Sequence, residues 1–265
     1  MENNMSGVIS MGRYRVAAVL AKERGYCALK CIDLSKKERS VVLINRYEGA
    51  ETIREMLPVL DEARRADHKR VWELFTETGA VNAVFPLEKG VRLDTLYGKK
   101  ACPTRVYANA LAQSYFHGLL ELAALPIEFL YAAAKCENVL VQEKARSASF
   151  MLFLPPSAKA SMREVSQEVE KSISRLFPRR FTSLSYELDL LDELKEGAFD
   201  GPAALYGRWL EAAEGYKSIG VPYEEKVFVA KFLALLSDKW KRRKKLRAKK
   251  KAQKAARERM EGMKA

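Results

Sequence analysis

The stretch YAAAKCENVLV, residues 131–141, decides how the rest of the sequence is interpreted. It begins with small apolar residues, passes through a polar turn and ends in an apolar, β-prone run. Upstream lies an alanine-rich amphipathic segment, residues 104–125, with Thr104 as a suitable N-cap and Pro126 just beyond its end. Downstream lies a second short apolar run, residues 149–154, which is expected to form a small hairpin with the first. The pattern predicts a long helix, a polar loop and a hairpin.

The N-terminal third of the sequence is rich in short β-prone runs, and the first three, which short polar turns join, are typical of an antiparallel meander. The expected strands are residues 13–20, 26–34, 40–47, 71–78 and 80–87. One helical stretch, residues 51–66, interrupts them, and it is expected to start near Pro58 or to bend there because proline removes a backbone donor. From residue 160 onward the pattern is helical, with breaks near Pro178 and at residues 197–202. The chain is therefore expected to be α+β.

This order resembles the two-lobe order of the protein kinases. The similar segments are the first three strands of the kinase small lobe (residues 12–47), its single regulatory helix (51–66), the hinge VFPLEKG (84–90) and the first long helix of the large lobe (104–125). The stretch 131–141 follows where the family has its catalytic loop, HRD and then an asparagine, and Lys135 and Asn138 match the family there. The resemblance implies an α+β two-lobe fold: an antiparallel β-rich small lobe with one helix, an abbreviated and mainly helical large lobe, and then a basic C-terminal helix.

Four departures from the family pattern affect its phosphate, metal and proton-transfer groups together. Asn45 stands where the family has the strand-three lysine that holds the nucleotide phosphates. The glycine-rich loop keeps only Gly25, and Ala133 replaces the catalytic aspartate. Residues 149–156, where the metal-holding aspartate should lie, contain no acid, and Asn138 alone cannot organise magnesium. The resemblance therefore implies a degenerate, catalytically inactive member that is not an enzyme, with no catalytic residues, no cofactor and no metal site.

Positive charge is concentrated at the C-terminal end of the sequence. Residues 239–265 hold 14 Lys and Arg against two acids, which is a net +12 of the chain's +13. We expect three regions: a kinase-like small lobe at residues 1–90, a helical large lobe at 91–238 and a basic helical tail at 239–265. The tail has few apolar residues of its own, so the segment 227–240 is expected to bury its apolar side chains against the body and anchor the tail.

The basic tail can be interpreted in three ways. It can bind nucleic acid by neutralising phosphates, or it can dock to an anionic membrane, although its lack of an apolar face argues against insertion into lipid. The third interpretation is a solubilising or partner-binding helix. An anionic partner is favoured because so many like charges repel one another without a counter-surface. The expected contact residues are Lys241, Arg242, Arg243, Lys244, Lys245, Arg247, Lys249, Lys250 and Lys251.

The other chemically active side chains are expected to be structural. The histidines, His68 and His117, are not placed to complete a metal or catalytic group. The acids Asp189, Asp192 and Glu193 are expected on a solvated helix face. The four cysteines are expected to be free thiols, and the three tryptophans to be packing anchors, with docking to a surface as an alternative for the last: Cys27, Cys31, Cys102 and Cys136; Trp72, Trp209 and Trp240.

No window approaches the roughly 20 apolar residues of a membrane-spanning helix, and the N-terminus lacks the order of a secretory signal. We therefore expect a cytoplasmic protein. Its basic tail also allows a peripheral position at a membrane surface. Some bacterial secretion-system components carry a kinase-like domain before a membrane span, which this sequence lacks. The first hypothesis is a non-enzymatic scaffold that binds a protein partner, with its tail tethering it to an anionic partner. One alternative is a nucleic-acid-associated protein whose basic helix binds RNA or DNA, and another is a residual kinase that uses an unorthodox metal site involving Asn138.

Overall fold

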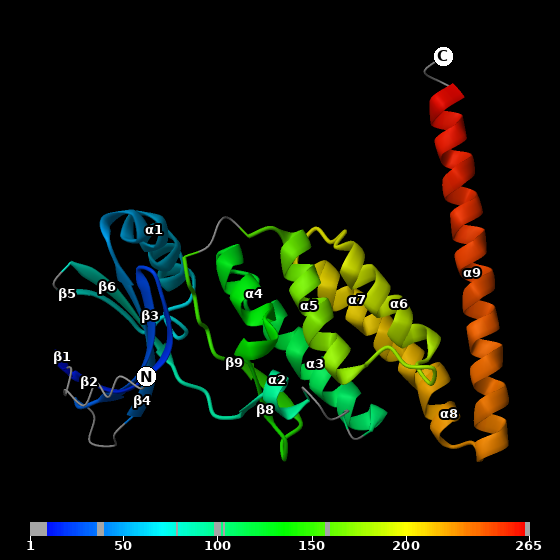
Figure 1. The fold of residues 1–265 in the computed structure, drawn as a ribbon, viewed down its shortest axis with the longest axis horizontal. Coiled ribbons are helices and arrows are strands. Elements are labelled where there is room, and N and C mark those ends of the chain that lie inside the picture. The colour runs from blue at the N-terminus through cyan, green and yellow to red at the C-terminus, as the bar shows by residue number, and fades with distance from the viewer. Residues whose placement is uncertain are drawn as a thin grey trace.

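The computed structural model describes residues 10–35, 40–77, 79–97, 102, 104–156 and 160–262, apart from the side chains at 10, 11, 253 and 256–262. The chain forms a strand-rich lobe, a helical lobe and one long C-terminal helix, and these follow one another across Figure 1. Residues 1–9, 36–39 and 263–265 lie outside the described residues. They include the predicted start of the small lobe, most of its second turn and the end of the tail.

An antiparallel sheet forms the first lobe, with the strand order β1-β2-β3-β4-β6-β5 among the described residues. Its strands are β1 Ser10–Met11, β2 Tyr14–Glu23, β3 Tyr26–Asp33, β4 Ser40–Glu48, β5 Glu73–Glu77 and β6 Ala80–Pro86. The central strand β4 is covered on both faces, which explains its continuous apolar run. Val42 and Ile44 pack in a small cluster with Val84 on one face, while Leu43 and Tyr47 belong to the main core on the other. The meander predicted for the first three runs is confirmed as β2-β3-β4, and β6 rather than β5 pairs with β4.

Helix α1 (Ala50–Ala66) packs against this sheet through its buried residues Met56, Leu60 and Ala63. It begins directly after Gly49, whose φ of 88° lies in the region that glycine tolerates. The helix continues through Pro58. The prediction of a start near Pro58 is therefore wrong, since the turns before it are also helical.

The second lobe is mainly helical. Its elements are β7 Val91–Arg92, α2 Leu93–Leu96, α3 Arg105–Glu121, α4 Ile127–Ala134, a 3-10 turn Cys136–Asn138, β8 Val139–Gln142, β9 Ser147–Phe150, α5 Met162–Leu176, α6 Ser185–Glu196, α7 Pro202–Gly215, a π-helical turn Tyr216–Gly220 and α8 Val221–Glu224. Thr104 caps α3 as predicted, because its hydroxyl accepts a hydrogen bond from the Tyr107 amide. The β8–β9 hairpin is also confirmed. Residues 131–134, compared above with the start of the kinase catalytic loop, belong to helix α4.

One continuous hydrophobic core joins the two lobes. Phe85 of β6 lies 6.1 Å from Phe129 of α4, measured between ring centroids, so the sheet packs directly on the helical lobe. Deeper in the helical lobe, Trp209 of α7 stacks on Phe116 of α3 with a centroid distance of 5.3 Å. The Trp209 indole also donates a 2.6 Å hydrogen bond to Gln113. Trp209 is thus a packing anchor, as predicted.

Helix α9 (Phe228–Gly262) is a single helix that runs past the end of the helical lobe, as Figure 1 shows at the right of the view. The region boundary predicted at residue 238 falls inside it. Trp240 is 65% exposed, so the prediction that it anchors packing is wrong. Within the described residues, no helix is long and apolar enough to cross a membrane.

The tryptophans give a direct test of this core. Trp209→Ala is expected to lower the free energy of unfolding by about 3–5 kcal/mol, because a large buried ring leaves a cavity. Trp240→Ala, at an exposed position, is expected to change it by only about 0.5 kcal/mol. Urea denaturation of both variants measures these values. Equal stability losses in the two variants would contradict the described packing.

Candidate functional site

The junction between the lobes is built on Asn45, the position expected to correspond to a strand-three lysine. Asn45 lies on the core face of β4 and is fully buried. Its amide nitrogen donates a 2.8 Å hydrogen bond to the backbone carbonyl of Leu152, which is 107 residues away in the sequence. Its amide oxygen accepts a 2.6 Å hydrogen bond from the Tyr26 hydroxyl. Asn45 therefore links two strands of the first lobe to the segment after β9.

Two tyrosines of the sheet, Tyr26 and Tyr47, add hydrogen bonds to the backbone of Leu154. The Leu154 amide donates to the Tyr26 hydroxyl at 3.1 Å, and the Tyr47 hydroxyl donates to the Leu154 carbonyl at 2.9 Å. Burial raises the pKa of both tyrosines well above the ordinary value, so both stay neutral. The result is a buried network in which Tyr26, Asn45 and Tyr47 hold residues 152–154 over the core face of the sheet. We call it the inter-lobe network.

Among the residues that resemble the kinase catalytic loop, Asn138 is linked to the inter-lobe network through a backbone hydrogen bond. The amide of Met151, the residue before Leu152 of the inter-lobe network, donates a 2.8 Å hydrogen bond to the Asn138 carbonyl. The side-chain nitrogen of Asn138 donates to the Ala132 carbonyl at 2.8 Å, and its oxygen is buried. Ala133 is fully buried in the last turn of α4. The Lys135 ammonium lies 4.7 Å from the centre of the Tyr131 ring. The side chains of Lys135 and Asn138 thus have different partners, although the Asn138 amide donates a 2.9 Å hydrogen bond to the Lys135 carbonyl.

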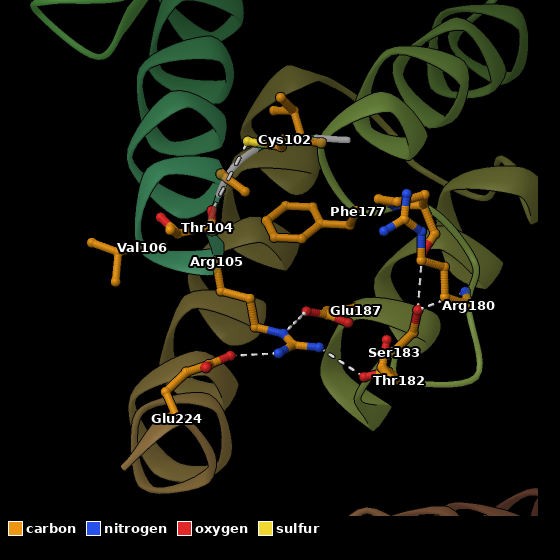
Figure 2. A pocket seen from close by; sticks show the side chains of 13 residues that line it. Cys102, Thr104, Arg105, Val106, Phe177, Arg180, Thr182, Ser183, Glu187 and Glu224 are labelled. Atoms are coloured by element: carbon orange, nitrogen blue, oxygen red, sulfur yellow. Dashed lines mark hydrogen bonds and ion pairs between the residues drawn. The ribbon is translucent and has the colours of Figure 1, made fainter. Parts of the chain in front are cut away.

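A second polar cluster holds α3, α6 and α8 together around Arg105, at a cavity of about 410 Å³ that Figure 2 shows. The guanidinium donates to Glu187 at 2.7 Å, to Glu224 at 2.5 Å and to the Thr182 carbonyl at 2.7 Å. Burial alone lowers the pKa of Arg105, but the two carboxylates outweigh it and raise the pKa above its ordinary value. Glu224 also pairs with Lys231 at 3.5 Å, so the cluster reaches the first turns of α9.

Helix α9 is fixed to α6 by matched polar pairs. The Asp238 carboxylate accepts hydrogen bonds from the amide (2.7 Å) and the hydroxyl (2.6 Å) of Ser185, at the positive N-terminal end of α6. One turn later, Arg242 pairs with Asp189 at 2.7 Å and with Asp192 at 2.5 Å. These residues lie one turn apart on each helix, so they form a ladder between the two. We call these pairs the α9 anchor.

The anchor differs from two expectations. Asp189 was expected on a solvated face, but its side chain is mostly buried against Arg242. Residues 227–240 were expected to bury their apolar side chains, and this is wrong: Leu235 is buried, whereas the large apolar side chains around it are exposed. The exposed ones are Val227, Phe228, Val229, Phe232, Leu233, Leu236 and Trp240. The sequence signal for the anchor was present as matching four-residue spacings, Asp238 to Arg242 and Ser185 to Asp189.

The predicted anionic-partner residues are mostly exposed along α9. Arg242 is the exception, since it is held in the anchor, and Lys245 lies 3.6 Å from the Asp189 carboxylate. The Lys244 ammonium lies 5.7 Å from the centre of the Trp240 ring. The remaining members are exposed: Lys241, Arg243, Arg247, Lys249, Lys250 and Lys251.

One cysteine, Cys102, lines the cavity beside Arg105, and its thiol lies 3.9 Å from the Thr104 carbonyl. All four are free thiols, as predicted. Burial raises the pKa of Cys31 to about 12 and that of Cys136 to about 11, so both thiols stay protonated at neutral pH. Among the described residues there is no group of three His, Cys, Asp or Glu that could hold a metal ion.

Solved structures that share this architecture are protein kinase domains. The chain aligns with Rad53 1–466 in complex with AMP-PNP at a TM-score of 0.55 and 9% identity, covering 74% of this chain and 65% of that one. It aligns with two substituted forms of the Mycobacterium tuberculosis PknI kinase domain at TM-scores of 0.56 and 0.53 and identities of 10% and 12%. These alignments cover 78% and 81% of this chain and 98% of each PknI chain.

The chain has a protein-kinase-like fold. The expected α+β two-lobe architecture is confirmed by these structures and by the observed topology. No family model matches the sequence, and no curated protein matches it either. The likeness to these kinase domains therefore lies in the arrangement of helices and strands, since the sequence identities are only 9–12%.

The comparisons also correct one prediction. The departures at Asn45 and Ala133 led to the expectation that the chain is not an enzyme. That conclusion is wrong, because the structures that share the fold are protein kinase domains, one of them in complex with AMP-PNP. The departures concern individual positions, and a kinase-like fold does not show that the chain is inactive.

The inter-lobe network can be tested at its central residue. Asn45→Ala leaves the Leu152 carbonyl and the Tyr26 hydroxyl without their partner, and it is expected to lower the free energy of unfolding by about 2–4 kcal/mol. Asn45→Asp keeps the shape. When protonated, its carboxyl group can accept from Tyr26 and donate to Leu152, whereas its ionised form faces the Leu152 carbonyl with a negative charge.

The pH dependence of Asn45→Asp follows from this contact. Burial raises the folded-state pKa of the new carboxyl above its unfolded value of about 3.9. The variant's stability relative to wild type is therefore greatest below pH 4. It falls by about 1.4 kcal/mol per pH unit until the folded-state pKa is passed. Urea denaturation of both proteins at a series of pH values measures the difference. A difference that does not change with pH would contradict a buried Asn45.

Proposed function

We propose that this chain is a kinase-like protein-binding scaffold module that is tethered through its basic helix α9 to an anionic partner. The observation that carries the proposal is the row of exposed Lys and Arg side chains on a helix that is fixed to the body. Their positive charge gives the helix a strong electrostatic attraction to any polyanionic surface. The body then occupies a set position next to that surface.

Two fixed junctions support a scaffold role. The inter-lobe network ties the sheet to residues 152–154 through buried hydrogen bonds. The α9 anchor ties the basic helix to α6 through Asp238 and Arg242. A partner bound on the body and an anionic partner bound on α9 would therefore be held in one geometry, which is the physical requirement of a scaffold.

The length of α9 supports the separation of these two roles. At 1.5 Å per residue, its 35 residues extend about 52 Å, which is longer than the helical lobe needs for packing. The anchor uses residues in the first half of the helix, while Arg247, Lys249, Lys250 and Lys251 lie beyond it and are exposed. These four cations are placed for a partner outside the body.

The proposal predicts salt-sensitive binding to a soluble polyanion. The full chain is expected to bind heparin, with an affinity that falls as salt rises because counterions are released. Arg247→Glu/Lys251→Glu reverses two exposed charges on α9, and it is expected to weaken binding at least tenfold and to lower the slope of log affinity against log salt. Titration at several salt concentrations measures both.

The matched control is Arg54→Glu/Arg64→Glu, which reverses two exposed charges on helix α1 and changes the net charge equally. It is expected to change heparin binding by less than threefold. Equal weakening by the two double variants would mean that net charge, and not α9, determines the binding. No binding by the wild-type chain would contradict the proposed function.

A further inference from the structure

The first half of α9 carries an apolar stripe on its outer side. Its side chains follow one another at spacings of three, four and one residues, which places them on one face of a helix. Phe228 is 86% exposed, and the others are exposed as well. We define the apolar stripe as Phe228, Val229, Phe232, Leu233, Leu236 and Trp240.

The apolar stripe faces away from the body. The side of α9 that contacts the lobe is marked by Leu235, Asp238 and Arg242. At 100° per residue, the centre of the apolar stripe lies about 130° around the helix from the centre of these three. The anchor therefore fixes α9 in the orientation that turns its apolar side chains outward. An exposed patch of this kind marks an interaction site.

The basic half of α9 continues the same face. Counting onward from Trp240, the side chains of Arg243, Arg247, Lys250 and Lys251 fall within the arc that the apolar stripe occupies, and all four are exposed. One outer face thus offers a hydrophobic half followed by a cationic half. A ligand that covers this face has to present both apolar surface and negative charge.

A face with one apolar and one cationic half does not match two other partners, a second copy of α9 and nucleic acid. In a parallel pair with α9 of a second copy, the cationic halves would face each other, and in an antiparallel pair each cationic half would face an apolar stripe. Nucleic acid phosphates satisfy the cations, but they leave the aliphatic side chains of Val229, Leu233 and Leu236 exposed to water. A membrane with anionic headgroups supplies acyl chains for the apolar stripe and phosphate or carboxylate groups for the cations.

We infer that the outer face of α9 binds the surface of an anionic lipid bilayer, with the apolar stripe inserted at the headgroup boundary and Arg243, Arg247, Lys250 and Lys251 on the headgroups. This inference rests on the proposed function and names its anionic partner. Tryptophan is well suited to this boundary because its ring is both apolar and polar. Trp240 lies where the apolar stripe meets the basic residues, and thus at that boundary.

The test uses the full chain and sedimentation with vesicles of phosphatidylcholine, with or without 30 mole per cent phosphatidylserine. Binding is expected only with the anionic lipid. Brominated acyl chains are expected to quench the emission of Trp240 on binding, and Trp240→Phe is expected to remove the quenched component. This second readout reports insertion, because a contact with headgroups alone leaves the ring outside the acyl region.

The deciding variant is Leu233→Ser/Leu236→Ser, in which two exposed side chains of the apolar stripe become polar. It is expected to lower partition into anionic vesicles at least tenfold and to abolish bromolipid quenching, while the melting temperature is unchanged. The matched control, Leu57→Ser/Leu210→Ser, replaces two exposed leucines on α1 and α7. It is expected to retain binding within about twofold of wild type.

The other outcomes separate this inference from the proposed function. Binding to vesicles that Leu233→Ser/Leu236→Ser leaves intact would overturn insertion. Binding to RNA, DNA or heparin without binding to anionic vesicles would overturn the lipid assignment and leave the anionic tether standing. A dimer that this double variant dissociates would assign the apolar stripe to a second copy and overturn the inference. Binding to none of these polyanions would overturn the proposed function itself.

Discussion

The buried contact of Asn45 with the Leu152 carbonyl is the interaction on which the arrangement of the two lobes depends. A polar side chain in the middle of a central strand is costly to bury unless each of its groups has a partner. Here the amide nitrogen meets Leu152 and the amide oxygen meets Tyr26. The sheet can satisfy Asn45 only when residues 152–154 lie against it, so the fold of one lobe requires the position of the other.

The α9 anchor has a similar logic at the other end of the molecule. Asp238 supplies negative charge to the N-terminus of α6, and Arg242 meets two acids on the same helix. Removing α9 would leave Asp189 without its cation, whereas Asp192 would keep its pair with Arg179. The same contacts decide which side of α9 faces outward, and they therefore determine the surface that a partner meets. Polar pairing with the body thus determines which side chains of α9 face outward.

Much of the fold follows from local sequence patterns. The β-branched runs and polar turns predict the sheet, and the alanine-rich segment with Thr104 predicts α3, because these signals act over a few residues. The resemblance also identified Asn45 as an unusual position. It did not predict what Asn45 contacts, since the partner lies 107 residues away and the contact uses backbone atoms. The exposure of residues 228–240 was missed for the opposite reason. An apolar pattern predicts a buried face, but α9 meets the body mainly through polar groups such as Lys231, Asp238 and Arg242, with Leu235 as the one large apolar side chain buried there among the described residues.

The most direct test of the account is native-state hydrogen exchange of the Leu154 amide, which donates to the buried Tyr26 hydroxyl. If the inter-lobe network joins the two lobes into one cooperative unit, this amide exchanges only through global unfolding, with the same free energy as the slowest amides of β4. In Tyr26→Phe, its protection is expected to fall below that of β4. Exchange of the wild-type Leu154 amide through a low-energy local opening, while β4 stays protected, would show that the lobes separate freely and would contradict the account.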